Sequence, residues 1–315
     1  MSRLHMGIDV GSTTVKVVVL DENNNTLFAE YRRHFSDIKS TVKGLFAEVK
    51  EVVKNEQFTV VITGSGGLLL SKMLDLPFVQ EVIANKTAII TGASRGIGAA
   101  IAKKLASCGY NLSLCCRNSS DRLKALADEL HCAYGIEVLC YTGNVGDFFF
   151  AKDMVANTIS HFGHIDVLIN NAGISHIGLL SDMTPEEWNN IVAINLTGVF
   201  NFTKLVIPYM VADKCGRILQ ISSVWGNVGA SCEVAYSACK GGINAFTKAL
   251  GKELAPSHIP VNAIACGVID TDMNLCFDEA ERAELADEIP AGRFATADEV
   301  ADMAYSVITA PDYLT

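Results

Sequence analysis

The chain has 315 residues, half of them apolar, and its 25 Lys and Arg against 35 Asp and Glu give a formal net charge of −10. This length allows one large domain or two modest ones, each with its own core. Lys and Arg are not concentrated into any stripe, so the electrostatic footprint of a nucleic-acid-binding protein is missing. We therefore expect no nucleic-acid partner.

Apolar runs in the sequence are short and broken by Gly or charged residues, so we expect no membrane-spanning helix. No long apolar stretch followed by small residues opens the chain, which argues against a secretory signal. The ten cysteines form no CxxC pair and no zinc-like Cys/His cluster, so we expect no metal site. Cys115 and Cys116 would point to opposite faces of a strand. A cytoplasmic protein with reduced thiols is expected.

The first 85 residues open with two expected strands around a tight turn, in GIDVGSTTVKVVVLD after Met6. A helix is expected over 38–55, then a strand over 59–63, the turn Gly64-Ser65-Gly66-Gly67, and another helix. Such glycine and hydroxyl turns hold phosphate through backbone N–H groups, and Asp9 could organise a metal-bound water.

This segment, with YRRHFSDIK and ITGSGG, resembles the start of the actin-like ATPase superfamily, and within it the activators of 2-hydroxyacyl-CoA dehydratases, also called the benzoyl-CoA reductase ATPase family. The resemblance covers residues 3–84 and implies a partial actin-like, ribonuclease H-like α/β subdomain over residues 1–85. The family's second phosphate motif, adenosine motif and iron–sulfur cysteines are absent from this segment. We expect weak ATP binding or none, with the strand-turn-strand of Asp9–Lys16 carried as a folded appendage.

From Lys86 onward the pattern alternates between strand and helix. The short apolar run Thr87–Thr91 meets the glycine cluster TGASRGIG, a helix continues to about Ser107, and a second strand covers Asn111–Cys115. Strand, glycine turn and helix form a dinucleotide-binding βαβ unit, in which glycines let the backbone approach a pyrophosphate at the helix N-terminus. The spacing is GxxxGxG in place of GxGxxG, so a glycine-rich turn without a ligand is the alternative.

Two further strands end in polar residues, and a long helix follows. Val167–Ile169 runs into NNAG, and Ile218–Ile221 ends at Ser222-Ser223. Tyr236 and Lys240 lie four residues apart and share one helix face, in a helix expected to reach Leu254. There the ammonium could lower the pKa of the phenol and make it a general acid or base. A packed aromatic beside a surface charge is the alternative.

TGASRGIG, NNAG, Asn195, the ISS strand end, YSACK and VNAIACGVIDTDM together resemble the short-chain dehydrogenase/reductase family, most closely its bacterial 3-oxoacyl-acyl-carrier-protein reductases. The resemblance covers residues 86–315. It implies that Tyr236 protonates the substrate oxygen, Ser223 hydrogen-bonds it, Lys240 binds the nicotinamide ribose and supports Tyr236, and Asn195 holds a water of the proton relay. It also implies the residues that line the cofactor: Gly92, Ser94, Arg95, Gly96, Ile97, Gly98, Arg117, Asn144, Val145, Asn171, Ala172, Gly173, Tyr236, Lys240, Ile269 and Thr271.

The choice of cofactor can be argued from charge. Enzymes of this architecture that use NAD place a carboxylate at the end of the second strand to bind the adenine ribose. Here that position holds Cys116, and Arg117 follows it, with Arg95 nearby in the glycine loop. Two guanidinium groups without a carboxylate suit a 2′-phosphate, so we expect NADP(H).

The substrate is less closely defined by the sequence. The reductases that this segment resembles dock an acidic carrier protein on basic residues beside the cleft. At one of these positions this chain has the basic residue Lys214. At the other it has Ser257, with only His258 next to it. The Pro-Gly of these reductases after the sixth strand is Cys266-Gly267 here. We expect a small-molecule or carrier-bound 3-oxoacyl substrate, with acyl carrier protein as a possible partner and a CoA thioester or small ketone as alternatives.

Both ends of the chain depart from the reductase pattern. The sequence ends at Thr315, where the family continues into Gly-Gln-Val and a last strand, so we expect an exposed sheet edge and altered stability or assembly of the family's homo-oligomer. At the other end, the two resemblances meet near 84–86, which predicts a fusion.

These features predict a Rossmann-type doubly wound parallel α/β sheet lacking its last strand over residues 86–315, preceded by the partial ATPase subdomain over 1–85. The expected function is NADPH-dependent reduction of a 3-oxoacyl thioester to the 3-hydroxyacyl form. The alternatives are an ATP-binding activator or regulatory module and an inactive fusion.

Overall fold

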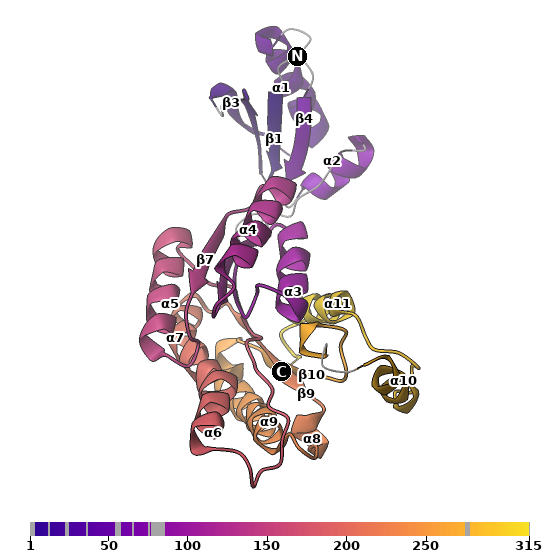
Figure 1. Cartoon of the computed structure of the whole chain (residues 1–315). Helices are drawn as coiled ribbons and strands as arrows, with labels where there is room; N and C mark the ends of the chain where they lie inside the picture. Colours follow the sequence, from indigo (N-terminus) through magenta and orange to yellow (C-terminus); the bar gives the residue numbers. More distant parts are fainter. Residues whose placement is uncertain are drawn as a thin grey trace. The chain divides into compact units, whose positions relative to one another are not determined.

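A computed structural model describes residues 4–11, 13–22, 25–35, 37–53, 58–64, 66–74, 76, 86–274 and 278–314. The chain divides into two compact units, Met1–Asn85 and Lys86–Thr315 (Figure 1). Residues 84 and 85 of the expected junction, the preceding residues 77–83, and the turn residues Ser12 and Ser65 lie outside the described residues.

The first unit is a four-stranded sheet with two helices. Its elements are β1 (Leu4–Val10), β2 (Thr14–Leu20), β3 (Thr26–Arg33), α1 (Ile38–Val53), β4 (Phe58–Thr63) and α2 (Gly67–Leu74). The strand order is β3-β2-β1-β4, with β1 antiparallel to β2 and parallel to β4. Alternate residues of β1 and β2 are buried and form one core with α1, because successive side chains of a strand point to opposite faces.

The turn residues of the first unit gather where the parallel strands β1 and β4 end. The Asp9 carboxylate forms an ion pair with Lys16 on β2, at 2.9 Å. Gly64 has a φ of +92°, and a Cβ there would lie 2.5 Å from Asp9 Oδ1. The Gly66 N–H donates to the Val10 carbonyl at 2.8 Å. The two glycine turns therefore lie side by side around Asp9.

The second unit is a doubly wound parallel sheet. Its strands are β5 (Thr87–Thr91), β6 (Asn111–Cys116), β7 (Val138–Thr142), β8 (Val167–Asn170), β9 (Arg217–Ser223) and β10 (Val261–Cys266), in the order β10-β9-β8-β5-β6-β7. Its helices are α3 (Gly96–Ser107), α4 (Ser120–Tyr134), α5 (Phe148–Phe162), α6 (Pro185–Val192), α7 (Gly198–Asp213), α8 (Trp225–Val228), α9 (Val234–Leu254), α10 (Glu279–Glu288) and α11 (Ala297–Ile308), with a π-turn η1 (Ala193–Thr197) and short 3₁₀ turns η2 (Ala255–Ser257) and η3 (Asp272–Asn274).

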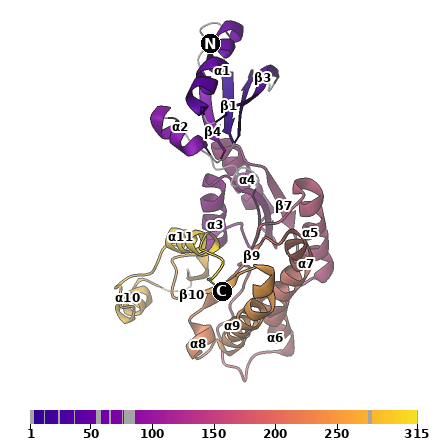
Figure 2. The same ribbon diagram turned by 180° about the vertical axis from the view of Figure 1, so that it is seen from behind.

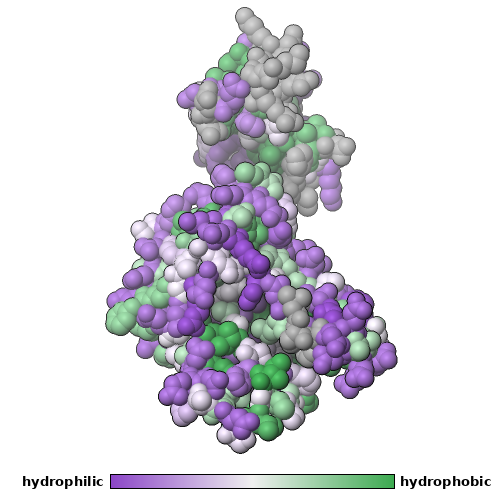
Figure 3. Space-filling view, in the orientation of Figure 1, coloured by the Kyte–Doolittle hydropathy of each residue, from purple (hydrophilic) through white to green (hydrophobic). Residues whose placement is uncertain are grey.

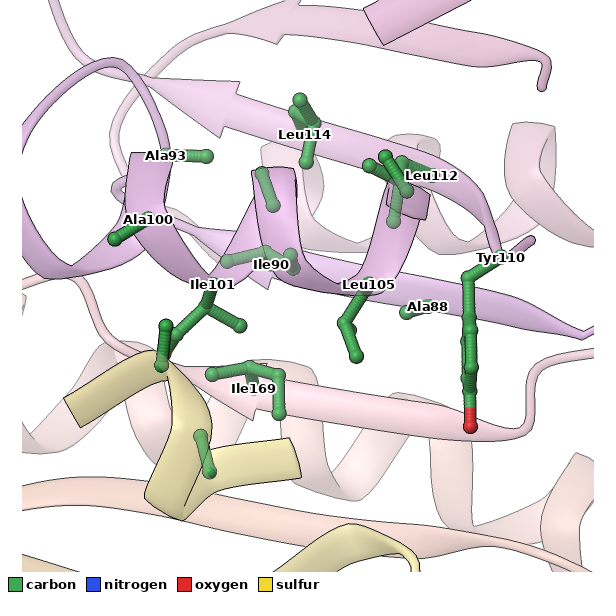
Figure 4. Packing of buried hydrophobic residues seen from close by; sticks show 14 of the residues in the cluster. Ala88, Ile90, Ala93, Ala100, Ile101, Leu105, Tyr110, Leu112, Leu114 and Ile169 are labelled. Atoms are coloured by element: carbon green, nitrogen blue, oxygen red, sulfur yellow. The ribbon is translucent and has the colours of Figure 1, made fainter. Parts of the chain in front are cut away.

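Two hydrophobic cores lie on the two faces of this sheet. One is covered by α3, α4 and α11, and the other by α5, α7 and α9, as Figures 1 and 2 show from opposite sides. Figure 4 shows the first core, in which Ile101 and Leu105 of α3 pack over Ile90 of β5. Cys115 belongs to one core and Cys116 to the other, which confirms that these neighbours point to opposite faces.

The continuous helical stretch Pro185–Asp213, formed by α6, η1 and α7, is long and apolar enough to cross a membrane by length and composition alone. Half of its most apolar window is buried. Phe202, Val206 and Met210 of this stretch are fully buried in the core beneath the sheet. Core packing thus accounts for its apolar character.

At the edge of the sheet, β10 pairs with β9 over its whole length, from Val261↔Ile218 to Cys266↔Ser223. In the part of the chain that the structure describes, no other strand pairs with β10. The Asn262 side-chain amide donates to the Leu314 carbonyl at 3.0 Å, so the segment after α11 returns to this edge strand.

The glycine loop generates the first prediction. A Cβ on Gly98 would lie 2.3 Å from the Gly92 carbonyl oxygen and 2.5 Å from the Asn171 amide nitrogen, so Gly98→Ala must move backbone. We expect a loss of about 1–3 kcal/mol in unfolding free energy. Gly267→Ala is the matched control, because a Cβ there meets nothing within 4 Å.

Denaturant unfolding followed by tryptophan fluorescence is the measurement, since both tryptophans of the chain lie in the second unit. Equal unfolding midpoints for the Gly98 and Gly267 variants would show that the loop is not packed as closely as described.

Candidate active site

The predicted site residues converge at the carboxyl ends of the parallel strands. The glycine loop follows β5, Arg117 follows β6, and Asn171 follows β8. Ser223 is the last residue of β9, and Cys266 is the last residue of β10, paired with it. Because parallel strands have their carboxyl ends on the same side of the sheet, residues far apart in sequence meet there. Doubly wound folds bind ligands at these strand ends.

The glycine loop is fixed by the segment after β8. The Asn171 side-chain amide donates to the carbonyls of Thr91 and Gly92, both at 3.0 Å. The backbone N–H groups of Asn171 and Ala172 both donate to the Thr91 hydroxyl at 3.0 Å. Gly92 and Gly96 have φ of +66° and +54°, a conformation that glycine adopts without strain. The loop thus presents its backbone at the start of α3.

The other residues predicted along the cofactor lie around this loop. Ser94 and Ile97 are half-buried, and Arg95 and Arg117 are exposed. Asn144 and Val145 follow β7; the Asn144 side-chain oxygen accepts from the Gly146 N–H at 3.1 Å. A Cβ on Gly96 would lie 3.4 Å from the Thr271 methyl group, so the segment after β10 approaches the glycine loop. The Ile269 carbonyl accepts from the Asn274 amide at 2.7 Å.

Asn195 is held by the backbone on the far side of the site. It lies in the π-turn η1 and is completely buried. Its side-chain oxygen accepts from the Ile174 N–H, and its amide donates to the Ile174 carbonyl, both at 2.8 Å. A Cβ on Gly173 would lie 3.1 Å from the Asn195 oxygen, so this glycine lets the chain after β8 pass close by. Single π-turns of this kind are common at functional sites.

Lys240 extends from α9 into the interior. Its side chain is buried, its ammonium donates to the Ile221 carbonyl of β9 at 2.7 Å, and it lies 5.5 Å from the Tyr236 ring centre. Burial lowers the pKa of Lys240 to about 8, with Cys266 and Cys239 acting in the opposite direction. The ammonium is therefore close to its titration point near neutral pH, unlike a solvated surface lysine.

Tyr236 and Ser223 are paired at the end of β9. The Tyr236 phenol and the Ser223 side chain are hydrogen-bonded to each other, and the Ser223 oxygen accepts from the Trp225 N–H at 3.2 Å. The structure thus brings the buried Ser223, Lys240 and Asn195 and the half-buried Tyr236 together at the carboxyl ends of the strands. The alternative of an exposed lysine beside a packed aromatic is excluded by the burial of Lys240.

The direction of one pKa differs from the expectation. Burial raises the pKa of Tyr236 to about 12; the hydrogen bond to Ser223 lowers it, and the charge of Glu233 raises it further. A neighbouring lysine was expected to lower it. Desolvation dominates because both groups are drawn into the interior, where the charged form of a phenol is disfavoured. The phenol is therefore held in its protonated form, as a proton donor.

Sequence reasoning missed several polar residues of this edge. Ser175, after β8, donates to the Glu233 carboxylate, and the Gly178 N–H donates to the Cys232 carbonyl, so two loops beside Tyr236 are joined. Glu233 lies three residues before Tyr236, a spacing that could have marked it. Arg122 and Asp272, which form an ion pair at 3.3 Å, were also missed.

The expected carrier-docking positions lie elsewhere. Lys214 ends α7, and Ser257 and His258 follow α9, so all three precede strands β9 and β10. Helix α9 has 21 residues and spans about 30 Å, with Tyr236 near its start and His258 beyond its end. These positions are thus at the amino ends of the strands, opposite the site. Within a single chain, the expectation that they lie beside the cleft is wrong.

Residues 86–282 match the short chain dehydrogenase family. An uncharacterized oxidoreductase of Bacillus subtilis, YmfI, is 40% identical over 218 residues, which are 69% of this chain and 89% of that protein. A 3-oxoacyl-[acyl-carrier-protein] reductase of Staphylococcus epidermidis is 38% identical over the same shares. The crystal structure of a variant actinorhodin polyketide ketoreductase with NADPH superposes with a TM-score of 0.67 and 34% identity, covering 72% of this chain and 91% of that one.

The chain therefore belongs to the short-chain dehydrogenase family, and its second unit has the Rossmann-like sheet of that family. As a member it is an oxidoreductase that acts on CH–OH groups or the corresponding carbonyls. The family match leaves out the first unit, and the resemblance of residues 3–84 to actin-like ATPases stays a prediction.

The buried lysine predicts a pH dependence of stability. The pKa of Lys240 is about 8 in the folded chain and 10.5 as the ordinary value, so between these pH values the unfolded chain holds a proton that the folded chain has released. Unfolding free energy therefore rises with pH in this window, by at most on the order of 3 kcal/mol. The measurement is denaturant unfolding at several pH values, with Lys240→Met as the reference. A difference between the two proteins that stays constant from pH 7 to about 10.5 would contradict the burial of a titrating amine.

Proposed function

We propose that the second unit reduces a 3-oxoacyl thioester to its 3-hydroxyacyl form with NADPH, and that Asn195, Ser223, Tyr236 and Lys240 carry the reaction. The observation that carries this proposal is the hydrogen-bonded pair of the buried Ser223 and the half-buried Tyr236, with the buried Lys240 ammonium beside the phenol ring. The relatives named as 3-oxoacyl reductases support the substrate class.

The residues at the glycine loop fit a dinucleotide phosphate. Gly92 and Gly98 let the glycine loop pack closely against Asn171 and Ala172 and turn into the start of α3, where N–H groups and the helix dipole favour an anion. No carboxylate stands at the end of β6, where the buried Cys116 is followed by the exposed Arg117. This combination supports NADP(H) over NAD(H), as does the NADPH bound in the crystal structure of the similar ketoreductase.

Within this arrangement each residue has a defined task. Bound NADPH supplies a hydride to the carbonyl carbon of the substrate. The Tyr236 phenol donates its proton to the carbonyl oxygen, and the Ser223 hydroxyl hydrogen-bonds the same oxygen and holds it in place. The Lys240 ammonium stabilises the phenolate that remains until solvent returns a proton. Asn195, held by the Ile174 backbone, orients the groups through which the proton returns from solvent to Tyr236.

Exposed apolar residues surround the mouth of the site and suit an acyl chain. The loop after β8 exposes Ile177, Leu179 and Leu180, and the segments around α8 and the start of α9 expose Val228 and Val234. Strongly hydrophobic residues gather in Figure 3 where α8 lies in Figure 1. An apolar rim around two polar catalytic groups favours a thioester with a hydrocarbon tail over a small polar ketone.

Acyl carrier protein and a homo-oligomer are expected from the family, but the expected carrier-docking positions Lys214 and Ser257 lie away from the catalytic residues. Both partners remain expectations. The expectation that the first unit binds ATP weakly or not at all also remains a prediction; the Asp9 carboxylate there is paired with Lys16. Calorimetric titration of the full chain with ATP and Mg²⁺ tests it, and binding would favour the activator alternative.

Replacement of Tyr236 by Phe tests the assignment directly. Removing the proton donor should lower the rate of NADPH oxidation with an acetoacetyl thioester by about 10²–10⁴-fold, because general acid catalysis contributes this much. Tyr134→Phe is the control, since Tyr134 is half exposed at the end of α4. Absorbance at the NADPH band is the readout. An unchanged rate in the Tyr236 variant would remove this residue from the mechanism.

A further inference from the structure

Two arginines from different elements meet on one carboxylate oxygen at the edge of the proposed nucleotide site. Arg95 of the glycine loop and Arg122 in the first turn of α4 each place Nη1 3.3 Å from Asp272 Oδ2. The contacts join parts of the chain that are 177 and 150 residues apart. Since both guanidinium groups reach the same atom, they form a single anion-binding position, and Asp272 fills it.

The location of this position follows from the elements that carry it. The end of β6, where doubly wound enzymes bind the adenine ribose, is followed by Arg117 and then by α4 with Arg122. Arg95 comes from the loop that ends β5. Asp272 is brought in by Thr271, whose methyl group would lie 3.4 Å from a Cβ on Gly96. The position therefore lies between the glycine loop and the end of β6, where a ribose 2′-phosphate would be placed.

Charge decides what this position prefers. Two guanidinium groups suit a phosphate monoester, which carries about two negative charges and three acceptor oxygens, better than they suit a single carboxylate. A phosphate that binds these two Nη1 groups displaces Asp272, because two anions on the same donors repel one another. The three side chains are 60%, 63% and 41% exposed, so the internal ion pairs are weak and displacement is inexpensive.

We infer that Asp272 is an internal competitor for the 2′-phosphate of the cofactor, and that Arg122 joins Arg95 as the second residue that recognises this phosphate. The inference rests on the proposed use of NADP(H). It makes Asp272 a residue that limits cofactor affinity and Arg122 a residue that determines cofactor specificity. Arg117, which the proposed function also uses as positive charge at the end of β6, contacts the Asn190 side-chain oxygen at 3.4 Å and not Asp272.

The test measures binding of two cofactor fragments to the full chain by calorimetry. Adenosine 2′,5′-bisphosphate carries the phosphate in question, and adenosine 5′-monophosphate lacks it. The native chain should bind the bisphosphate more tightly. Asp272→Asn should tighten the bisphosphate by about threefold, and Arg122→Gln should weaken it by about fivefold, with the monophosphate unchanged in both.

Matched controls separate these effects from a general change in charge. Asp270→Asn removes a carboxylate two residues away, whose partner is Arg282 at 2.7 Å, and Arg293→Gln removes an arginine that pairs with Glu299. Both should leave the ratio of the two affinities as in the native chain. In the double variant of Asp272 and Arg122, the effect of the Asp272 substitution should shrink, because the two residues share one interaction.

The outcomes distinguish the inference from the function on which it rests. If Asp272→Asn leaves bisphosphate binding unchanged or weakens it, Asp272 does not compete with the phosphate. If Arg122→Gln keeps the affinity ratio of the native chain, Arg122 does not recognise the phosphate. If the native chain binds both fragments equally, the NADP(H) preference fails and the inference fails with it. If it binds neither fragment, the nucleotide site itself is refuted. Circular dichroism spectra of the exposed-residue variants verify folding.

Discussion

The buried ammonium group of Lys240 is the constraint on which the catalytic edge depends. An unpaired buried charge is costly, so this group must keep its hydrogen bond to the Ile221 carbonyl, which locks α9 against the end of β9. That lock sets the position of Tyr236 one turn earlier on α9, next to Ser223. Gly173 passes close to Lys240 and Asn195 because it has no side chain. One interaction thus aligns a helix, a strand and a loop.

Local sequence predicted most of the second unit because each of its signals lies within a few residues. The strand Thr87–Thr91, the glycine loop and the helix after it needed no distant information, and the alternation of strand and helix implied the parallel sheet. The spacing of Tyr236 and Lys240 placed them on one face of α9. In the first unit, the helix expected over 38–55 is α1 over Ile38–Val53, and the last two expected residues lie outside the described residues.

Properties that depend on distant contacts could not be predicted in the same way. The raised pKa of Tyr236 comes from burial by elements far along the chain, and sequence shows only its neighbour Lys240. The π-turn at Asn195 has no local signature that we recognised. The joint contact of Arg95 and Arg122 with Asp272 spans three segments. The carrier-docking positions Lys214 and Ser257 rest on resemblance alone, and strand direction places them at the opposite ends of the strands.

In the proposed function, the edge formed by Ser223, Tyr236 and Lys240 directs hydride transfer to the ketone carbon of a 3-oxoacyl thioester. The most direct measurement uses NADPH deuterated at the transferred position of the nicotinamide, with acetoacetyl thioester and the full chain, and mass spectrometry of the product. We predict a 3-hydroxyacyl thioester with one deuterium on the carbon that bears the new hydroxyl. Consumption of NADPH without deuterium at that carbon, or no reduced product at all, would contradict this proposal.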